Sequence, residues 1–411
     1  MHGSENSITI LILMTGAILV STALIKLFFE RLNIPAVVGF ILFGLGLNLV
    51  DSRTGFITAD AHATLRFLSG IGIICLLFRA GLECDLQGLI SQLRRASLVW
   101  AINMAGSGLA GFMTAYWLLG YTLVPSLIVA AALTATSVGI SLAVWQQYKA
   151  TDSDNGRLLL DVAELDDISA VILMAMLFTL IPLLANGRTD QLLSAIAGTG
   201  LVFGLKFFGF IALCYYFATL AEHPIVHFFK KFDPPPLPML TVVGIGFIIA
   251  AIAGFLDFSV AIGAFFAGLV FSRDSEAVKL EASFLPLYEF FTPFFFLVIG
   301  LDITIGAMEH SIPLVLALFA AAVAGKLIAN GIPLWFMKGL PGALLIGTSM
   351  VPRAEIAMIV MQKGAQLGEN IMPPELFSAM AMVSILTCAL APISVRPMLE
   401  RWPQNRKTPQ P

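Results

Sequence analysis

Apolar runs of roughly membrane-spanning length recur along almost the whole chain. The first begins at about Ile8, and the others cover residues 34–50, 65–83, 96–119, 124–145, 158–184, 192–221, 237–256, 258–272, 288–302, 312–336, 342–363 and 373–398. A bilayer core about 30 Å thick is crossed by about 20 helical residues. A backbone inside that core must satisfy its own hydrogen bonds. The sequence therefore predicts an all-α polytopic membrane protein with about thirteen transmembrane helices.

Composition agrees with this class and excludes others. The chain has 411 residues, of which 58% are hydrophobic and 12% are charged, and its net charge is -3; the mean hydropathy is +0.91. No basic block is present, so we expect the lipid bilayer and no nucleic acid as a partner. Cysteines and histidines form no nucleophile or metal-ligand pattern. We therefore expect a protein that is not an enzyme and has no cofactor.

The distribution of positive charge predicts the orientation. With thirteen spans the two termini lie on opposite sides of the membrane. One set of loops, together with the C-terminal tail, carries most of the lysines and arginines, and the opposite set carries Arg53, Arg188 and Lys363. Loops rich in positive charge stay in the cytoplasm. We expect a multi-pass protein of the cell (inner) membrane with its N-terminus outside and its C-terminus in the cytoplasm.

Four carboxylates interrupt the apolar run 158–184. They are Asp161, Glu164, Asp166 and Asp167. Asp167 follows Arg157 by about ten residues, which is about 15 Å along a helix and close to the bilayer midplane. Ionisable groups at this depth are rare and mark substrate or ion pathways. The acids therefore predict an ion or proton site, with Asp161 nearer the cytoplasmic mouth.

Two further runs carry features that break a helix. Thr134-Ala135-Thr136-Ser137-Val138-Gly139 places hydroxyls and a glycine inside one run, and Met350-Val351-Pro352-Arg353-Ala354-Glu355 places a proline and two charges inside another. Proline removes a backbone donor. Broken helices at the midplane expose carbonyls and helix ends to a transported ion. We expect both helices to be broken near the site, although hydroxyls and prolines in membrane helices also serve packing alone.

The run 312–336 contributes Lys326, with Asn330 one turn further on. Adjacent helical residues point about 100° apart. One acid of the Asp166-Asp167 pair can therefore face Lys326 while the other faces a cavity. Arg353 and Glu355 compensate charge or couple to protons on one interpretation, and form a structural ion pair on the other.

The motifs, taken in order, resemble a known family. Gly156-Arg157 through Leu165-Asp166-Asp167 resembles the Asp-Asp signature of sodium/proton antiporters in the monovalent cation/proton antiporter-2 family. Other segments agree, namely Phe78 to Leu86, Ala261 to Leu269, Pro293 to Gly300, Gly325-Lys326 and Pro352 to Glu355. The resemblance covers nearly the whole chain. It implies the sodium/proton antiporter fold, with inverted repeats and two crossing broken helices.

The same resemblance implies a division of the chain. A dimerisation domain is expected from residues 1–95 and 237–310, and a core ion-transport domain from residues 96–184 and 311–398. Residues 185–236 form a linker helix and residues 399–411 a short cytoplasmic tail. A homodimer with elevator-like movement of the core is implied. The chain departs from the family pattern at Phe40 and Glu164, where an acid and an apolar residue, respectively, are common.

The mechanism that fits is competition at one site. Asp167 binds either a sodium ion or a proton, and Thr136 and Ser137 help to complete an oxygen shell. Asp166 pairs with Lys326 in the proton-loaded state, and Lys326 releases a second proton when sodium arrives. Glu164 lies close to the face of Asp167. Two protons against one sodium ion make the exchange electrogenic.

Other functions stay open at this point. A potassium/proton antiporter of the same family is the nearest alternative, because the sequence does not fix cavity size or ligand number. A cation channel or an ion-sensing receptor on this fold comes next, but a channel needs no paired titratable acids with a buried lysine. The main prediction is a secondary active transporter that exchanges sodium or lithium for protons.

Overall fold

The computed structural model describes residues 2–32, 34–83, 86–185, 192–221, 237–256, 258–272, 277–304 and 312–404. Every regular element within these ranges is a helix, and none is a strand. The predicted all-α class is therefore confirmed. Arg188 and the segments 186–191 and 222–236 of the predicted linker 185–236 lie outside the described residues.

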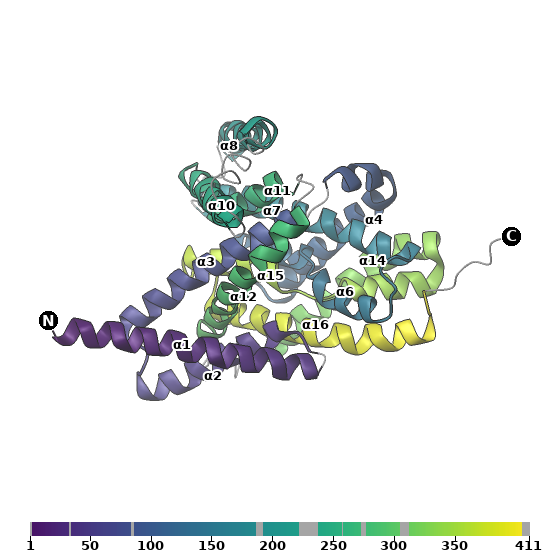
Figure 1. Cartoon of the computed structure of the whole chain (residues 1–411). Helices are drawn as coiled ribbons and strands as arrows, with labels where there is room; N and C mark the ends of the chain where they lie inside the picture. Colours follow the sequence, from purple (N-terminus) through teal and green to yellow (C-terminus); the bar gives the residue numbers. More distant parts are fainter. Residues whose placement is uncertain are drawn as a thin grey trace. The chain divides into compact units, whose positions relative to one another are not determined.

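The helices follow the apolar runs of the sequence (Figure 1). They are α1 (His2–Arg31), α2 (Ala36–Thr54), α3 (Ala59–Glu83), α4 (Leu86–Met113), η1 (Thr114–Leu118), α5 (Leu123–Thr134), α6 (Val138–Gln147), α7 (Asp154–Ala185), α8 (Leu192–Tyr216), η3 (Phe217–Ala221), α10 (Leu237–Phe255), α11 (Val260–Phe271), α12 (Ala277–Leu301), α14 (Ile312–Ser349), α15 (Glu355–Gln366) and α16 (Pro374–Arg401). The π-helices η1 and η3 continue α4 and α8. Within the described ranges these elements form thirteen membrane helices, the number that the sequence predicts.

Eight helices in the described part of the chain are long and apolar enough to cross a membrane. Three shorter apolar helices, Gly204–Leu220, Met239–Phe255 and Val260–Phe271, accompany them. The length of α7 also suits a span, since its 32 residues rise about 48 Å at 1.5 Å per residue. Its four internal acids lower its hydropathy. The chain is a multi-pass membrane protein.

The boundary between the runs 312–336 and 342–363 lies where the sequence predicts it. α14 covers the first run and the start of the second, and it comprises two helices that meet at a kink. Gly339 forms this kink, with φ 71° and ψ 175°. Glycine adopts a positive φ without steric cost, and Pro341 lacks the N–H that would continue regular bonding. A kink therefore forms the boundary between the two helices.

Both predicted helix breaks are present. α5 ends at Thr134, Ala135 is extended with φ -62° and ψ 145°, and α6 begins at Val138. α14 ends at Ser349 and α15 begins at Glu355. Hydroxyl side chains compete with helical bonding in the first break, and proline disfavours the helical conformation of the residue before it in the second.

A backbone hydrogen bond joins the two breaks. Ser137 N donates to Pro352 O at 3.0 Å. Because each partner lies in an unwound segment, the two broken helices cross at their breaks. This confirms the predicted crossing.

The contacts divide the chain into two compact units. The first unit comprises Met1–Phe56, Gln87–Leu173 and Leu297–Pro411, and the second comprises Ile57–Leu86 and Met174–Phe296. Both broken helices and the start of α7 belong to the first unit. The division into dimerisation and core domains stays a prediction.

Small residues bring helices together within each unit. In the second unit, an added Cβ at Gly81 would lie 2.1 Å from Phe265 O, and one at Gly268 would lie 2.0 Å from Phe78 O. In the first unit, α4 and α14 meet where an added Cβ at Gly106 would lie 2.7 Å from Ala329 Cβ. Close backbones at such contacts are typical of membrane helices.

The contact between α4 and α14 can be tested at Gly325. A Cβ there would lie 3.0 Å from Ala110 Cβ, whereas a Cβ at Gly331 on the same helix meets nothing within 4 Å. We predict that Gly325→Leu lowers the free energy of unfolding by about 1 to 3 kcal/mol, the usual cost of overpacking. Gly331→Leu, the matched control, should change it little. Melting curves of the purified variants measure both, and equal melting temperatures would contradict this packing.

Candidate ion-binding site

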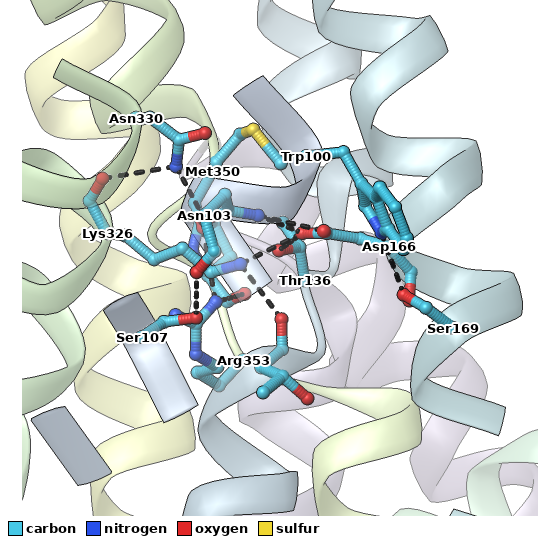
Figure 2. A network of polar contacts seen from close by, with 12 residues as sticks. Trp100, Asn103, Ser107, Thr136, Asp166, Ser169, Lys326, Asn330, Met350 and Arg353 are labelled. Carbon is cyan, nitrogen blue, oxygen red and sulfur yellow. Dashed lines mark hydrogen bonds and ion pairs between the residues drawn. The ribbon is translucent and has the colours of Figure 1, made fainter. Parts of the chain in front are cut away.

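Asp166 lies at the centre of a buried hydrogen-bond network (Figure 2). Its side chain is 1% exposed. Asn103 Nδ2, on α4, donates to both carboxylate oxygens, at 2.8 and 2.6 Å. Thr136 Oγ1, in the first break, donates at 2.8 Å. A buried carboxylate with several donors is stabilised as an anion.

Lys326 supplies the charge that balances this anion. Its Nζ lies 2.9 Å from Asp166 Oδ2, and its side chain is fully buried. The same ammonium donates to Thr134 O at 2.8 Å. That carbonyl is at the C-terminal end of α5, where the helix dipole is negative. Lys326 therefore stabilises both the acid and the first helix break.

Two asparagines extend the network between α4 and α14. Asn330 Nδ2 donates to Asn103 Oδ1 at 2.8 Å and to Lys326 O at 3.1 Å. Both side chains are fully buried. Within the described residues, the polar contacts of the Asp166 side chain come from groups of the first unit.

The backbone of α7 is also fixed near the acid. Trp100 Nε1 donates to Ser169 Oγ at 3.0 Å, and Ser169 Oγ donates to Asp166 O at 3.0 Å. Because Trp100 lies on α4, one turn before Asn103, the same helix holds both the side chain and the backbone of Asp166.

Arg353 occupies the second break and is fully buried. Its Nη1 donates to Met350 O at 3.1 Å and to Pro352 O at 3.2 Å. Helix α16 holds its backbone, because Arg353 N donates to Thr387 Oγ1 at 3.2 Å and Ser384 Oγ donates to Arg353 O at 2.5 Å. The guanidinium thus satisfies carbonyls that the unwound segment exposes.

Ser137 and Glu355 connect the two breaks through their side chains. Ser137 Oγ donates to Glu355 Oε2. Glu355 is the first residue of α15, and Ser137 directly precedes α6. A carboxylate at a helix N-terminus is favoured by the helix dipole. Glu355 therefore lies where two positive helix ends approach each other.

Asp167 has a different environment from Asp166. It is half-buried, and within the described residues no hydrogen bond to its carboxylate is found. Asp166, Glu355 and Glu164 are the acids that interact with it electrostatically, and Lys326 is the cation. Carboxylates gathered in this way favour a bound cation or proton. Alkali cations prefer oxygen ligands of the kind present here.

The structure brings most of the predicted residues together but changes some partners. Asp166 contacts Lys326, as the sequence suggested. Thr136 and Ser137 were expected beside Asp167, but they donate to Asp166 and Glu355 instead. Their part in a sodium shell stays a prediction.

The interpretation of Arg353 and Glu355 as an ion pair is not supported by the contacts. No such pair lies within the described part of the chain, and the guanidinium contacts carbonyls instead. The carbonyls of a broken helix need hydrogen-bond donors, and the guanidinium of Arg353 on the same segment donates to two of them.

Sequence reasoning missed Asn103 and its neighbour Trp100. Both stand in the apolar run 96–119, which carries no acid and no break. An amide inside a membrane helix is itself a signal, because it must find a partner on another helix. The spacing of Trp100 and Asn103 places them on one face, one turn apart.

Comparisons with known proteins identify the family of this chain. The sequence model of a family described as "Sodium/hydrogen exchanger, transmembrane" matches residues 17–401. The chain is 28% identical over 343 residues to the high-affinity Na⁺/H⁺ antiporter NhaS3 of Synechocystis sp., covering 81% of this chain and 71% of that protein. It is 29% identical over 386 residues to the Na⁺/H⁺-K⁺ antiporter GerN of Bacillus cereus, covering 93% and 94%.

A solved structure shares the fold. The sodium proton antiporter MjNhaP1 of Methanocaldococcus jannaschii superposes with a TM-score of 0.67 at 16% identity, covering 97% of this chain and 100% of that one. The family match spans both helix breaks, the acids of α7 and Lys326. With its multi-pass helical fold and its crossing broken helices, the chain belongs to the sodium/hydrogen exchanger family.

Proposed function

We propose that this protein is a secondary active antiporter that exchanges sodium or lithium for protons across the cell (inner) membrane. The observation that carries the proposal is the buried pair of Asp166 and Lys326 beside the half-buried Asp167, at the crossing of two broken helices. Family membership supports cation/proton exchange. Ionisable side chains buried in a membrane are costly to the stability of a protein, and where they occur they mark ion or proton pathways.

Exchange proceeds by competition at Asp167. This carboxylate holds either a proton or a sodium ion, since both neutralise its charge. Sodium binding draws Asp166 away from Lys326, and the lysine then releases a second proton. Two protons against one sodium ion make the cycle electrogenic. The hydroxyls of Thr136 and Ser137, which lie in the first break, supply oxygen atoms to the shell of the ion.

The remaining parts of the proposal concern assembly and movement. The N-terminus lies outside and the C-terminus in the cytoplasm, which the charge of the loops supports. Two copies form a homodimer, and the core moves against the dimerisation domain like an elevator. The bond from Ser137 N to Pro352 O supports this motion, because it lets both breaks travel together.

A potassium/proton exchange is the second candidate. It is favoured by the relative GerN, whose name includes potassium as well as sodium. The two candidates share one site and one mechanism, and they differ only in the cation that Asp167 accepts.

Proteoliposomes loaded with a pH dye test the function. Sodium and lithium pulses should move protons, and potassium pulses should move fewer. Larger proton movement with potassium would establish the second candidate. Cation pulses without any proton movement would reject both.

We predict that Asp167→Asn abolishes sodium-driven proton movement. An amide neither carries a proton nor neutralises a cation. The matched control is Asp152→Asn in the exposed loop before α7, which should exchange like the unmodified protein. Size-exclusion profiles confirm folding of both, and substantial exchange by Asp167→Asn would remove this residue from the site.

A second prediction concerns Lys326→Gln. Removing one member of a buried ion pair costs about 3 to 5 kcal/mol of stability, so the melting temperature should fall. Less charge should move per cycle, as measured by currents on a supported membrane. Lys338→Gln on the same helix is the control, because its partner Asp154 is largely exposed. Unchanged charge per sodium ion in Lys326→Gln would contradict a proton on Lys326.

A third prediction concerns Glu164. Its negative charge helps to attract a cation to Asp167, so Glu164→Gln should raise the apparent sodium KM several-fold and leave the maximal rate nearly unchanged. Initial rates over a range of sodium concentrations measure both quantities. An unchanged KM together with a lower melting temperature would instead indicate a structural contact.

A further inference from the structure

Asn103 and Asn330 link the carboxylate of Asp166 to a backbone carbonyl of α14 (Figure 2). Neither residue is a member of the predicted ion site. Each is fully buried, so water does not set its orientation. The direction of every hydrogen bond in this chain of amides can therefore be derived from its fixed end.

The fixed end is the carbonyl of Lys326, which only accepts hydrogen bonds. Asn330 must therefore turn its amide nitrogen toward Lys326 O, at 3.1 Å. The same nitrogen faces the Asn103 side chain at 2.8 Å, so Asn103 must present its oxygen there. The nitrogen of Asn103 is then left to face Asp166, because an amide has one oxygen and one nitrogen.

This direction decides how Asp166 can be protonated. Asn103 Nδ2 lies 2.8 and 2.6 Å from the two oxygens of Asp166. A proton on the carboxyl group would point at donors, and only the Thr136 hydroxyl or a neutral Lys326 can accept it. A reversed Asn103 would present its oxygen to Asp166 and its nitrogen to the nitrogen of Asn330, which leaves two donors facing each other.

The charged groups around Asp166 are also compatible with an ionised carboxylate. Lys326 on α14 and Arg353 in the second break are the cations that interact with it, and Asp167 on its own helix is an acid beside it. Glu355 and Glu164 act on Asp167. Arg353 stays charged when Lys326 is neutral, so one buried cation remains near the Asp166 carboxylate.

Close packing keeps the asparagines in register. The Cβ position of Gly106 on α4 lies 2.7 Å from Ala329 Cβ on α14. Gly106 follows Asn103 by one turn, and Ala329 directly precedes Asn330. A separation between these helices would break the bond between the two amides.

We propose that Asn103 and Asn330 are positioning residues, whose fixed amide direction holds Asp166 ionised throughout exchange. The inference rests on the proposed antiport for its role in transport. The direction of the amides and the charge of Asp166 are properties of the resting protein and can be measured without a gradient.

Infrared spectroscopy of the full-length protein in detergent measures the charge directly. Protonated carboxyl groups have a carbonyl band that ionised carboxylates lack. Across the pH range of activity, Asp166→Asn should remove no such band from the unmodified protein. In Asn330→Leu, which frees Asn103 to reverse, a carboxyl band should appear that the additional substitution Asp166→Asn removes. A band lost on Asp166→Asn in the otherwise unmodified protein would overturn the proposal.

Transport supplies a second readout. Asn103→Leu and Asn330→Leu should both move the pH profile of exchange to higher pH, although only Asn103 contacts Asp166. Because both residues act through the same hydrogen bond, the double variant should move the profile no further than Asn103→Leu alone. Asn103→Gln, which keeps an amide donor, should recover part of the shift. Ser107→Ala is the control, since Ser107 donates only to the backbone of Asn103, at 2.6 Å. Lower stability with an unmoved pH profile in both leucine variants would reduce the asparagines to structural contacts.

These measurements separate the two proposals. If the unmodified protein moves no protons with any cation, the proposed antiport fails while the infrared bands still report on Asp166. If Asn330→Leu does not fold, Asn330→Ala also removes the donor with less crowding. A protein that exchanges sodium for protons but protonates Asp166 within its working range would refute the inference alone.

Discussion

The backbone exposed by two broken helices is the constraint on which the first unit depends. Each break leaves carbonyls and amides without helical partners, and such groups are costly at membrane depth. Lys326 binds Thr134 O in the first break, and Arg353 binds Met350 O and Pro352 O in the second. Side chains of α16 hold the backbone of Arg353. The buried cations therefore have a structural task that accompanies their electrostatic one.

The same cations explain why buried acids are tolerated. Asp166 receives hydrogen bonds from Asn103 on α4, from Thr136 in the first break and from Lys326 on α14, which is also its ion-pair partner, so its charge is well solvated by protein groups. Asp167, one residue later, is only half-buried, and its carboxylate has fewer hydrogen-bond donors around it within the described residues. A rotation of about 100° between adjacent helical residues produces this difference. One acid is thereby fixed within the network, and the other is available to a ligand.

The sequence predicted the helices, the two breaks and the pairing of Asp166 with Lys326, because apolar length, proline and intramembrane charge are strong local signals. It placed the boundary between two helices at 337–341, where Gly339 lies, but it did not distinguish a loop from a kink there, since a Gly-Leu-Pro sequence suits either. It also did not assign the hydroxyls of Thr136 and Ser137 to Asp166 and Glu355. Those partners depend on how segments about 30 to 220 residues apart approach in space, which periodicity does not contain. Asn103 was missed for the same reason.

The bonds from Ser137 to Pro352 and Glu355 have a consequence for variation within such chains. They join a segment from the first half of the sequence to one from the second, so neither break can change its backbone path without disturbing the other. Substitutions in residues 134–138 should therefore be accompanied by compensating substitutions in residues 350–355. A chimera that exchanges one of these segments alone would combine two halves shaped for different partners.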